Sequence, residues 1–299
     1  MDKEYAYSEI FYSMQGEGEY TGVPTAWLRF FLCNLQCDGF GQEDPTDPST
    51  YKLPYKDVIA TDYDRIEDLP VFEYGCDSSY SWSKKFRDLQ YKGNVKQIGD
   101  RILETLPKNT FGDNIHMCFT GGEPLMKHAQ EASIGVMDYL ISEGHKIPSV
   151  TYETNGTQEL TEEFENFWGW TNNTTDETEL FFSVSPKLWT VAGEKPKKAI
   201  KPDNVAQYNQ VSGRGQLKFV CNGTNECWDE LESVVEQFRQ AGVEYPIWIM
   251  PVGATVEGQK GELAGAKFTD GDIANQALQR GYNVSARVHT YMWGNVIGV

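Results

Sequence analysis

The cysteine-bearing stretch of this chain reads Leu32-Cys33-Asn34-Leu35-Gln36-Cys37. It directly follows the largely apolar run from Ala26 to Leu32. This run predicts a buried strand, with both cysteines just beyond its carboxyl end. Ligands of α/β proteins bind at the carboxyl ends of parallel strands. The pair is therefore expected at the ligand-binding edge of a sheet. A third cysteine opens a separate stretch, Cys76-Asp77-Ser78-Ser79-Tyr80-Ser81-Trp82.

Short apolar runs rich in β-branched and aromatic residues alternate with amphipathic segments, a pattern typical of βα units and a parallel sheet. At 299 residues the chain is long enough for one large α/β domain, which we expect over residues 1–299. The predicted strands are residues 25–32, 114–120, 149–153, 180–184, 216–221 and 246–250, with a closing strand near 284–292. The predicted helices are residues 95–106, 128–143 and 226–241.

Two segments break this alternation and are interpreted as insertions. Residues 38–75 are rich in Asp, Pro and Tyr, lack helical periodicity and are long for a loop, which favours a small inserted subdomain. Residues 188–215 contain several Lys, Pro and Gly residues and are interpreted as a surface excursion or lid.

Charge and hydropathy narrow the class of function. A formal net charge of −18 argues against a nucleic-acid partner, because Lys and Arg supply most affinity for phosphate backbones. No run approaches the roughly 18 apolar residues of a membrane helix, and the polar start is unlike a signal peptide. We therefore expect a cytoplasmic protein with no membrane contact. Its six cysteines are expected to be reduced, with Cys118, Cys221 and Cys227 structural.

A glycine-rich motif, Thr120-Gly121-Gly122-Glu123-Pro124, follows one predicted strand and precedes a helix. Glycines let a ligand approach the main chain closely, and Glu123 can accept hydrogen bonds from a cationic amine. Taken alone, the motif could equally be a plain strand-to-helix turn.

The ordered set of motifs resembles the 7-carboxy-7-deazaguanine synthases of the radical S-adenosylmethionine superfamily. The resemblance runs from end to end, and each single motif is weak while their order is specific. After the cysteines and the glycine-rich motif, the similar segments are Phe11 to Gly18, Tyr20 to Pro24, Arg29, Glu153 to Thr157, Ser183 to Lys187, Met250-Pro251, Val288 to Asn295 and Gly298-Val299.

The resemblance implies a partial TIM-like barrel of the radical S-adenosylmethionine type and a 4Fe-4S cluster held by Cys33, Cys37 and Cys76. Thiolates are the usual ligands of such clusters. It further implies ring contraction of 6-carboxy-5,6,7,8-tetrahydropterin to 7-carboxy-7-deazaguanine, with loss of ammonia. The residues implied to surround S-adenosylmethionine are Gly75, Asp77, Gly121, Gly122, Glu123, Glu153, Asn155, Ser185, Pro186, Lys187 and Met250.

The resemblance also implies the substrate contacts. These are Met14, Gln15, Gly16, Glu17, Arg29, Thr120, His289 and the terminal carboxylate of Val299. Ser78 stands where the family usually has a threonine that binds Mg²⁺, and it retains the hydroxyl oxygen that this hard cation needs. Three plainer interpretations stay open: Arg29 as a surface cation, a structural ion pair between Glu153 and Lys187, and His289 as a core histidine.

The sequence departs from the family at the third cysteine. Most members place it two residues after the second, where this chain has Phe40, which cannot ligate iron. Cys76 is favoured because Asp77-Ser78 and the residues beyond it match what normally follows the third cysteine. A long spacer is tolerable, since the entropy cost of closing a loop grows only logarithmically with its length.

The resemblance implies a homodimer and an electron donor such as flavodoxin or ferredoxin. Two alternatives remain at this stage. Another radical S-adenosylmethionine enzyme, such as a glycyl-radical activase, would share the cysteines and the glycine-rich motif but would not need Gln15-Gly16-Glu17. A non-catalytic metal-binding protein would bind no S-adenosylmethionine.

Overall fold

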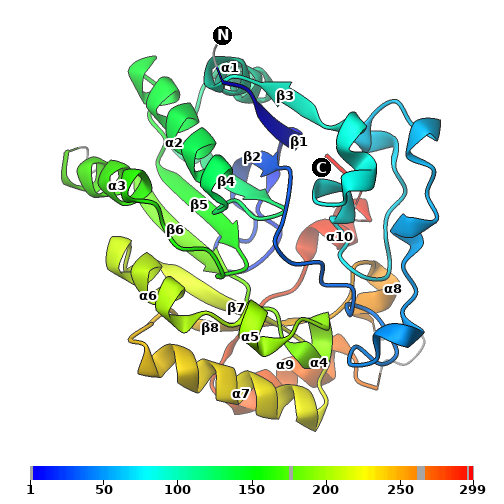
Figure 1. The fold of residues 1–299 in the computed structure, drawn as a ribbon. Coiled ribbons are helices and arrows are strands. Elements are labelled where there is room, and N and C mark those ends of the chain that lie inside the picture. Colours follow the sequence, from blue (N-terminus) through cyan, green and yellow to red (C-terminus); the bar gives the residue numbers. More distant parts are fainter. Residues whose placement is uncertain (1–2, 175–177, 261–266, 295, 299) are drawn as a thin grey trace.

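The computed structural model describes residues 3–174, 178–260, 267–294 and 296–298. Within them, the strands form one nine-stranded sheet in the order β3-β1-β2-β4-β5-β6-β7-β8-β9 (Figure 1). From the β2–β4 pair to β9, neighbouring strands are parallel and follow one another in sequence order. This arrangement confirms an α/β protein whose sheet is mostly parallel.

The six predicted parallel strands are confirmed within one or two residues at each end. They are β2 (Pro24–Phe30), β4 (His116–Gly121), β5 (Ser149–Thr154), β6 (Glu179–Val184), β7 (Gly215–Cys221) and β8 (Ile247–Pro251). Their near-continuous burial explains the apolar runs, because a parallel sheet covered on both faces leaves few polar positions.

Two antiparallel strands were not predicted. β1 (Tyr5–Met14) pairs with β2 on one side and with the short β3 (Tyr91–Gly93) on the other. Ser8 and Glu9 interrupt the apolar character of β1, yet both are buried. Glu9 stands opposite Arg29 in the β1–β2 register, so the two charges compensate each other across the strands.

Helices cover the outer face of the sheet (Figure 1). The predicted ones are confirmed as α1 (Val95–Thr105), α2 (Lys127–Ser142) and α7 (Asn225–Gln240). α3 (Glu162–Thr174) and α6 (Pro202–Val211) complete a series in which each helix contacts the next, and α9 (Asp270–Gln279) packs against β8. Loops and the carboxyl-terminal segment lie on the opposite side of the sheet (Figure 1).

The segment 38–75 contains four 3-10 turns, η1 (Pro48–Thr50), η2 (Pro54–Lys56), η3 (Ala60–Asp62) and η4 (Ile66–Asp68). It has a small core of its own, which includes Tyr55, Ile66 and Phe72 and continues into η5 (Ser79–Ser81) and η6 (Lys84–Leu89). The two ends of the segment meet, because the Gly75 N–H donates to the Phe40 carbonyl at 2.8 Å. Its standing as a separate subdomain stays a prediction.

The segment 188–215 contains α4 (Trp189–Ala192), α5 (Pro196–Ala199) and α6. Val191, Ala192, Ala199 and Val205 are buried, so this segment shares in the packing of the protein. Whether it acts as a lid stays a prediction.

The predicted closing strand is wrong over most of its length. The structure has a two-residue strand, β9 (Asn283–Val284), followed by the helix α10 (Val288–Trp293). β-branched and aromatic residues suggested a strand here. In the structure Arg287 turns into the protein interior before α10 begins, which ends the extended run.

Two short helical elements complete the description, η7 (Pro107–Asn109) and α8 (Val256–Gln259). None of the helices in the described parts of the chain is long and apolar enough to cross a membrane.

Candidate active site

One cavity of about 290 Å³ lies at the carboxyl ends of the parallel strands. It is lined by nearly all of the residues that the sequence singled out, which come from β1, β2, β4, β5, β8 and α10 and from loops. These residues are Met14, Gln15, Gly16, Glu17, Arg29, Cys33, Cys37, Gly75, Cys76, Asp77, Thr120, Gly121, Gly122, Glu153, Asn155, Ser185, Lys187, Met250 and His289.

Four predicted residues stand apart from this set. Glu123, Pro186 and Ser78 do not line the cavity. Val299 lies outside the described residues.

The three candidate cysteines reach the same cavity from both ends of the segment 38–75. The hydrogen bond between Gly75 and Phe40 closes that segment, so Cys76 returns beside the position where the family has its third cysteine. Phe40 itself packs with Cys33, Cys37 and Cys76 in one small cluster. The long spacer therefore does not separate the thiols in space.

Burial keeps these thiols protonated unless a positive centre binds. It raises the pKa of Cys33 to about 12 and that of Cys76 to about 11, and it raises the pKa of Cys37 well above its ordinary value. Iron would supply the charge that thiolates need here. Within the described residues, no three His, Cys, Asp or Glu side chains form a site for a single metal ion. A 4Fe-4S cluster does not need such a site, because each of its cysteines binds a different iron atom.

The glycine-rich motif lies against the cysteine strand. A Cβ on Gly122 would meet the Leu32 carbonyl oxygen at 2.0 Å, and the Glu123 N–H donates to that same oxygen at 2.8 Å. Only glycine allows this close approach between the two loops. The motif thereby sets the position of the chain immediately before Cys33.

Glu123 does not face the cavity as the sequence suggested. It is fully buried, and its carboxylate accepts hydrogen bonds from Thr154 Oγ1 at 2.6 Å and from the N–H groups of Asn155 and Leu125 at 2.8 and 3.0 Å. These contacts tie the end of β4 to the end of β5. In the structure its carboxylate braces Asn155, which does line the cavity, and a direct contact between Glu123 and a ligand stays a prediction.

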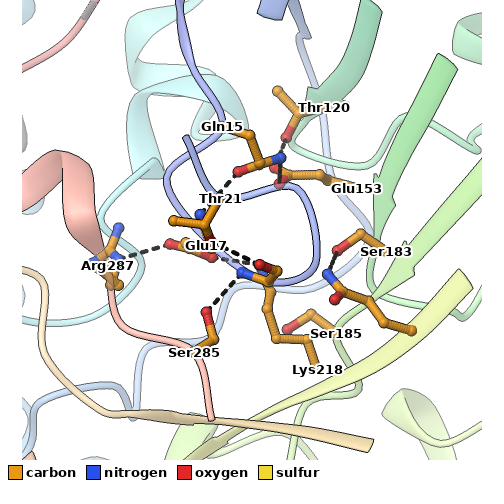
Figure 2. Close-up of polar contacts among 12 residues, drawn as sticks. Gln15, Glu17, Thr21, Thr120, Glu153, Ser183, Ser185, Lys218, Ser285 and Arg287 are labelled. Atoms are coloured by element: carbon orange, nitrogen blue, oxygen red, sulfur yellow. Dashed lines mark hydrogen bonds and ion pairs between the residues drawn. The ribbon is translucent and has the colours of Figure 1, made fainter. Parts of the chain in front are cut away.

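Gln15 joins two parts of the cavity wall (Figure 2). Its Nε2 donates to Glu153 Oε1 and its Oε1 accepts from the Glu17 N–H, each at 3.1 Å. Glu153 also accepts from Thr120 Oγ1 at 3.1 Å. Lys187 instead donates to Ser185 Oγ at 2.9 Å, so the described contacts do not include the ion pair between Glu153 and Lys187 that the sequence left open.

Glu17 lies between two cations that the sequence analysis missed (Figure 2). Its carboxylate pairs with Lys218 on one oxygen and with Arg287 on the other, the latter at 2.8 Å. Burial opposes ionisation of Glu17, but the charges of Lys218, Arg287 and His289 hold its pKa far below the ordinary value. Arg287 also pairs with Asp77 at 2.7 Å, which connects Glu17 to the residue after Cys76.

One sequence signal could have found Lys218. It is the only charged residue of β7, Gly215–Cys221, and a charge within a buried apolar strand requires a partner. The same argument applies to Arg29, which is also a charge within an apolar strand. Arg287 carried no comparable signal, because no regular element surrounds it.

Arg29 is an inward-facing cation, not a surface one. Its Nε pairs with Glu9 at 2.5 Å, and its Nη1 lies 3.5 Å from Ser78 Oγ and from the Gly121 carbonyl. Tyr80 donates to the same Glu9 oxygen at 2.7 Å. This arrangement holds the guanidinium group at the cavity wall, where it can meet an anionic ligand group.

Within the described residues, three buried polar atoms of the cavity lining have no hydrogen-bond partner. They are Glu9 Oε2 and the indole Nε1 atoms of Trp27 and Trp82. Since buried polar atoms are nearly always hydrogen-bonded in complete structures, an acceptor and two donors here suit a polar ligand.

His289 packs directly on Gly16. A Cβ on Gly16 would lie 1.9 Å from His289 Nδ1, and the Gly16 carbonyl accepts the N–H of Val288 at 2.9 Å. The start of α10 is therefore fixed on the loop after β1, and glycine is needed at that loop to leave room for the imidazole.

We expect Gly16→Ala to lower kcat/KM roughly 10- to 100-fold, because displacement of an active-site group by about 1 Å commonly costs that much. The matched control is Gly213→Ala, since a Cβ at Gly213 meets nothing within 4 Å. Steady-state kinetics of both variants check the prediction. Equal activity in the two would show that the contact between Gly16 and His289 does not matter.

Comparison with known proteins gives matches along nearly the whole chain, although no protein-family model matches. The 7-carboxy-7-deazaguanine synthase of Halobacterium salinarum is 24% identical over 310 residues, covering 96% of this chain and 90% of that protein. The enzyme of the same name from Rhodopirellula baltica is 25% identical over 299 residues, covering 96% and 86%. That from Pyrobaculum aerophilum is 23% identical over 296 residues, covering 97% and 95%.

Among solved structures, the crystal structure of QueE from Escherichia coli superposes with a TM-score of 0.54 at 18% identity, covering 96% of this chain and 95% of that one. This match concerns the fold. With the sequence matches, it confirms that the chain resembles the 7-carboxy-7-deazaguanine synthases along nearly its whole length.

Proposed function

We propose that this protein is a 7-carboxy-7-deazaguanine synthase, a radical S-adenosylmethionine lyase of queuosine-type biosynthesis. It contracts the ring of 6-carboxy-5,6,7,8-tetrahydropterin to 7-carboxy-7-deazaguanine with loss of ammonia. The observation that carries the proposal is that one cavity gathers the three thiols, the glycine-rich motif and the polar residues near Gln15. The full-length relatives with this name support the same conclusion.

Cys33, Cys37 and Cys76 would hold the 4Fe-4S cluster. When bound, the cluster and S-adenosylmethionine supply a carbon-centred radical, which no side chain can provide. The donor set fits the cluster, since three thiols share one cavity and thiolates are the usual ligands of such clusters. Gly121, Gly122 and Asn155 would hold S-adenosylmethionine next to it.

The substrate would lie on the side of the cavity formed by Gln15, Glu17, Arg29 and His289. Arg29 offers the forked donors that suit the pterin carboxylate. The amide and carboxylate groups suit the donors and acceptors of the pterin ring, and a site built to hydrogen-bond a heterocycle rejects analogues that lack its polar atoms.

Two distant segments complete the wall and reduce its contact with water. The segment 38–75 contributes Pro70, Val71 and Glu73, and the carboxyl-terminal segment contributes residues 296–298. We infer that the insertion shapes the active site as well as separating the cysteines in sequence.

Magnesium stays a prediction, and the oxygen atoms around Ser78 do not fit it well. The Ser78 hydroxyl donates to Asp77 Oδ1 at 3.1 Å, and Arg29 Nη1 stands 3.5 Å from the same hydroxyl. A guanidinium cation at that distance disfavours a second cation. We therefore derive no step through Mg²⁺.

The remaining predictions concern the type of fold, the oligomeric state, the electron donor and the location of the protein. They are a partial TIM-like barrel, a homodimer, a flavodoxin or ferredoxin as electron donor, and a cytoplasmic location. The chemistry of the cavity requires a donor of one electron to reduce the cluster, but it does not depend on which protein supplies that electron or on the other three predictions.

The decisive experiment is anaerobic turnover of the reconstituted protein with 6-carboxy-5,6,7,8-tetrahydropterin, S-adenosylmethionine and dithionite. Mass spectrometry should find 7-carboxy-7-deazaguanine and one ammonia per product. A cluster-loaded protein that cleaves S-adenosylmethionine but forms no deazaguanine would favour a glycyl-radical activase. A protein that assembles no iron–sulfur chromophore would favour a non-catalytic metal-binding role.

Protonation of His289 at low pH should lower the free energy of unfolding of the protein. Burial lowers the pKa of His289 below its ordinary value of 6.5, against an opposing pull from Glu17. The folded state thus prefers the neutral imidazole. This preference contributes fully to the stability of the fold above pH 6.5, the pKa in the unfolded chain, and the contribution is lost as the pH falls through the lower pKa of the folded state. Urea unfolding of wild type and His289→Gln between pH 7.5 and 5.5 measures this. The variant should lose less stability over that range; identical losses would contradict the assignment.

A further inference from the structure

The loop between the first two cysteines is held from behind by the end of α4. Glu194 Oε1 accepts the N–H of Gln36 at 2.7 Å and the N–H of Cys37 at 2.9 Å. The Gly39 N–H donates to the Ala192 carbonyl at 3.0 Å. These contacts fix the backbone on both sides of Cys37.

Cys37 needs this support. Its φ is +55°, a left-handed conformation that costs a non-glycine residue roughly 1–2 kcal/mol. Its thiol lines the active-site cavity, while Glu194 does not. The carboxylate thus contacts the loop on the side away from the cavity.

The charge on Glu194 is poorly screened. Its side chain is 8% exposed, and Cys37 is also buried. The second carboxylate oxygen, Oε2, meets Lys198 Nζ at 3.3 Å, and that lysine is 51% exposed on the surface helix α5. A buried charge acts over several ångströms at low dielectric, whereas the exposed lysine is weakened by water and salt.

We propose that Glu194 is a positioning residue that also lowers the reduction potential of the cluster bound by Cys37, with Lys198 partly offsetting it. The inference rests on the proposed function only in requiring that a cluster is bound. One electron enters the cluster and no bond is made or broken, so the reduced form carries one more negative charge. A neighbouring carboxylate disfavours that form, and a neighbouring ammonium favours it.

The two carboxylate oxygens have separate tasks, which makes the substitution informative. Because Oε1 alone accepts both backbone N–H groups, the amide oxygen of Glu194→Gln can keep them. The amide nitrogen would then take the place of Oε2 next to Lys198. The substitution therefore removes the charge while retaining the hydrogen bonds to the loop.

The test is an anaerobic redox titration, followed by electron paramagnetic resonance, of reconstituted wild type, Glu194→Gln and Lys198→Gln without substrate. We expect a more positive potential for Glu194→Gln and a more negative one for Lys198→Gln. The second shift should be smaller and should shrink with added salt. Asp203→Asn and Lys197→Gln, which remove exposed charges from α6 and α5, serve as matched controls and should leave the potential unchanged.

An unchanged potential in a fully loaded Glu194→Gln protein would overturn the tuning role. If Glu194→Gln fails to hold iron, Lys198→Gln still tests the proposal, because that variant leaves both hydrogen bonds from the loop to Glu194 in place. An unchanged or more positive reduction potential for Lys198→Gln would also overturn the tuning role. The readout is independent of product formation, so a failure of this inference is distinct from a failure of the proposed function.

Discussion

We expect Cys76→Ala to abolish cluster assembly and to reduce product formation to background. The cluster needs three thiolates, and with Phe40 at the family's usual third position no other thiol lines the cavity. The remaining pair could bind iron only weakly. Iron and sulfide analysis of the anaerobically reconstituted protein, with its visible charge-transfer absorbance, measures the loss.

The matched control is Cys118→Ala. Cys118 is fully buried in β4 and does not line the cavity, so its loss removes only a small apolar group at a cost on the order of 1 kcal/mol. This variant should hold a complete cluster. Full iron content in Cys76→Ala would show that the third ligand was assigned wrongly.

The parallel sheet could be predicted because its cause is local in sequence. Buried strands such as β5 and β7 are continuous apolar runs, and the helices between them carry apolar residues at helical spacing. The antiparallel β1 was missed because its buried Glu9 breaks that signal. Glu9 is explained only by Arg29, twenty residues away in sequence and opposite it in the sheet.

The cavity was predictable wherever a motif ended a strand, as with Gly121-Gly122 and Glu153. Which residues pair with one another in and around the site was not predictable. A lone charge in β7 marks Lys218 as needing a partner, but only the fold shows that Glu17, more than 200 residues earlier, pairs with Lys218 and Arg287. Likewise, only the fold brings Glu194 to the backbone of Cys37.

The orientation of the Glu123 side chain was not predictable either. A carboxylate after two glycines suggested a direct ligand contact, but the tight turn directs it inward, where Thr154 and Asn155 satisfy it. Sequence spacing indicated that the residue belongs to the site. It could not indicate which side of the loop the side chain faces.

The other large effect is expected from Arg287→Met. Arg287 is 11% exposed and joins Glu17 to Asp77, so its loss leaves two buried carboxylates with less compensation. Breaking a buried ion pair by removing one partner commonly costs about 3–5 kcal/mol. We expect a clear loss of thermal stability and a fall in kcat/KM of about 100-fold or more, with the cluster retained, because no cysteine contacts the guanidinium group in the described structure.

The control is Arg101→Met, which removes an exposed ion pair with Glu104 that should contribute about 0–1 kcal/mol. A double-mutant cycle gives the stronger test. If Arg287 acts by holding Glu17, then Arg287→Met combined with Glu17→Gln should cost less than the two single losses added together, with a coupling of about 1 kcal/mol or more. Additive losses would mean that the two residues act separately.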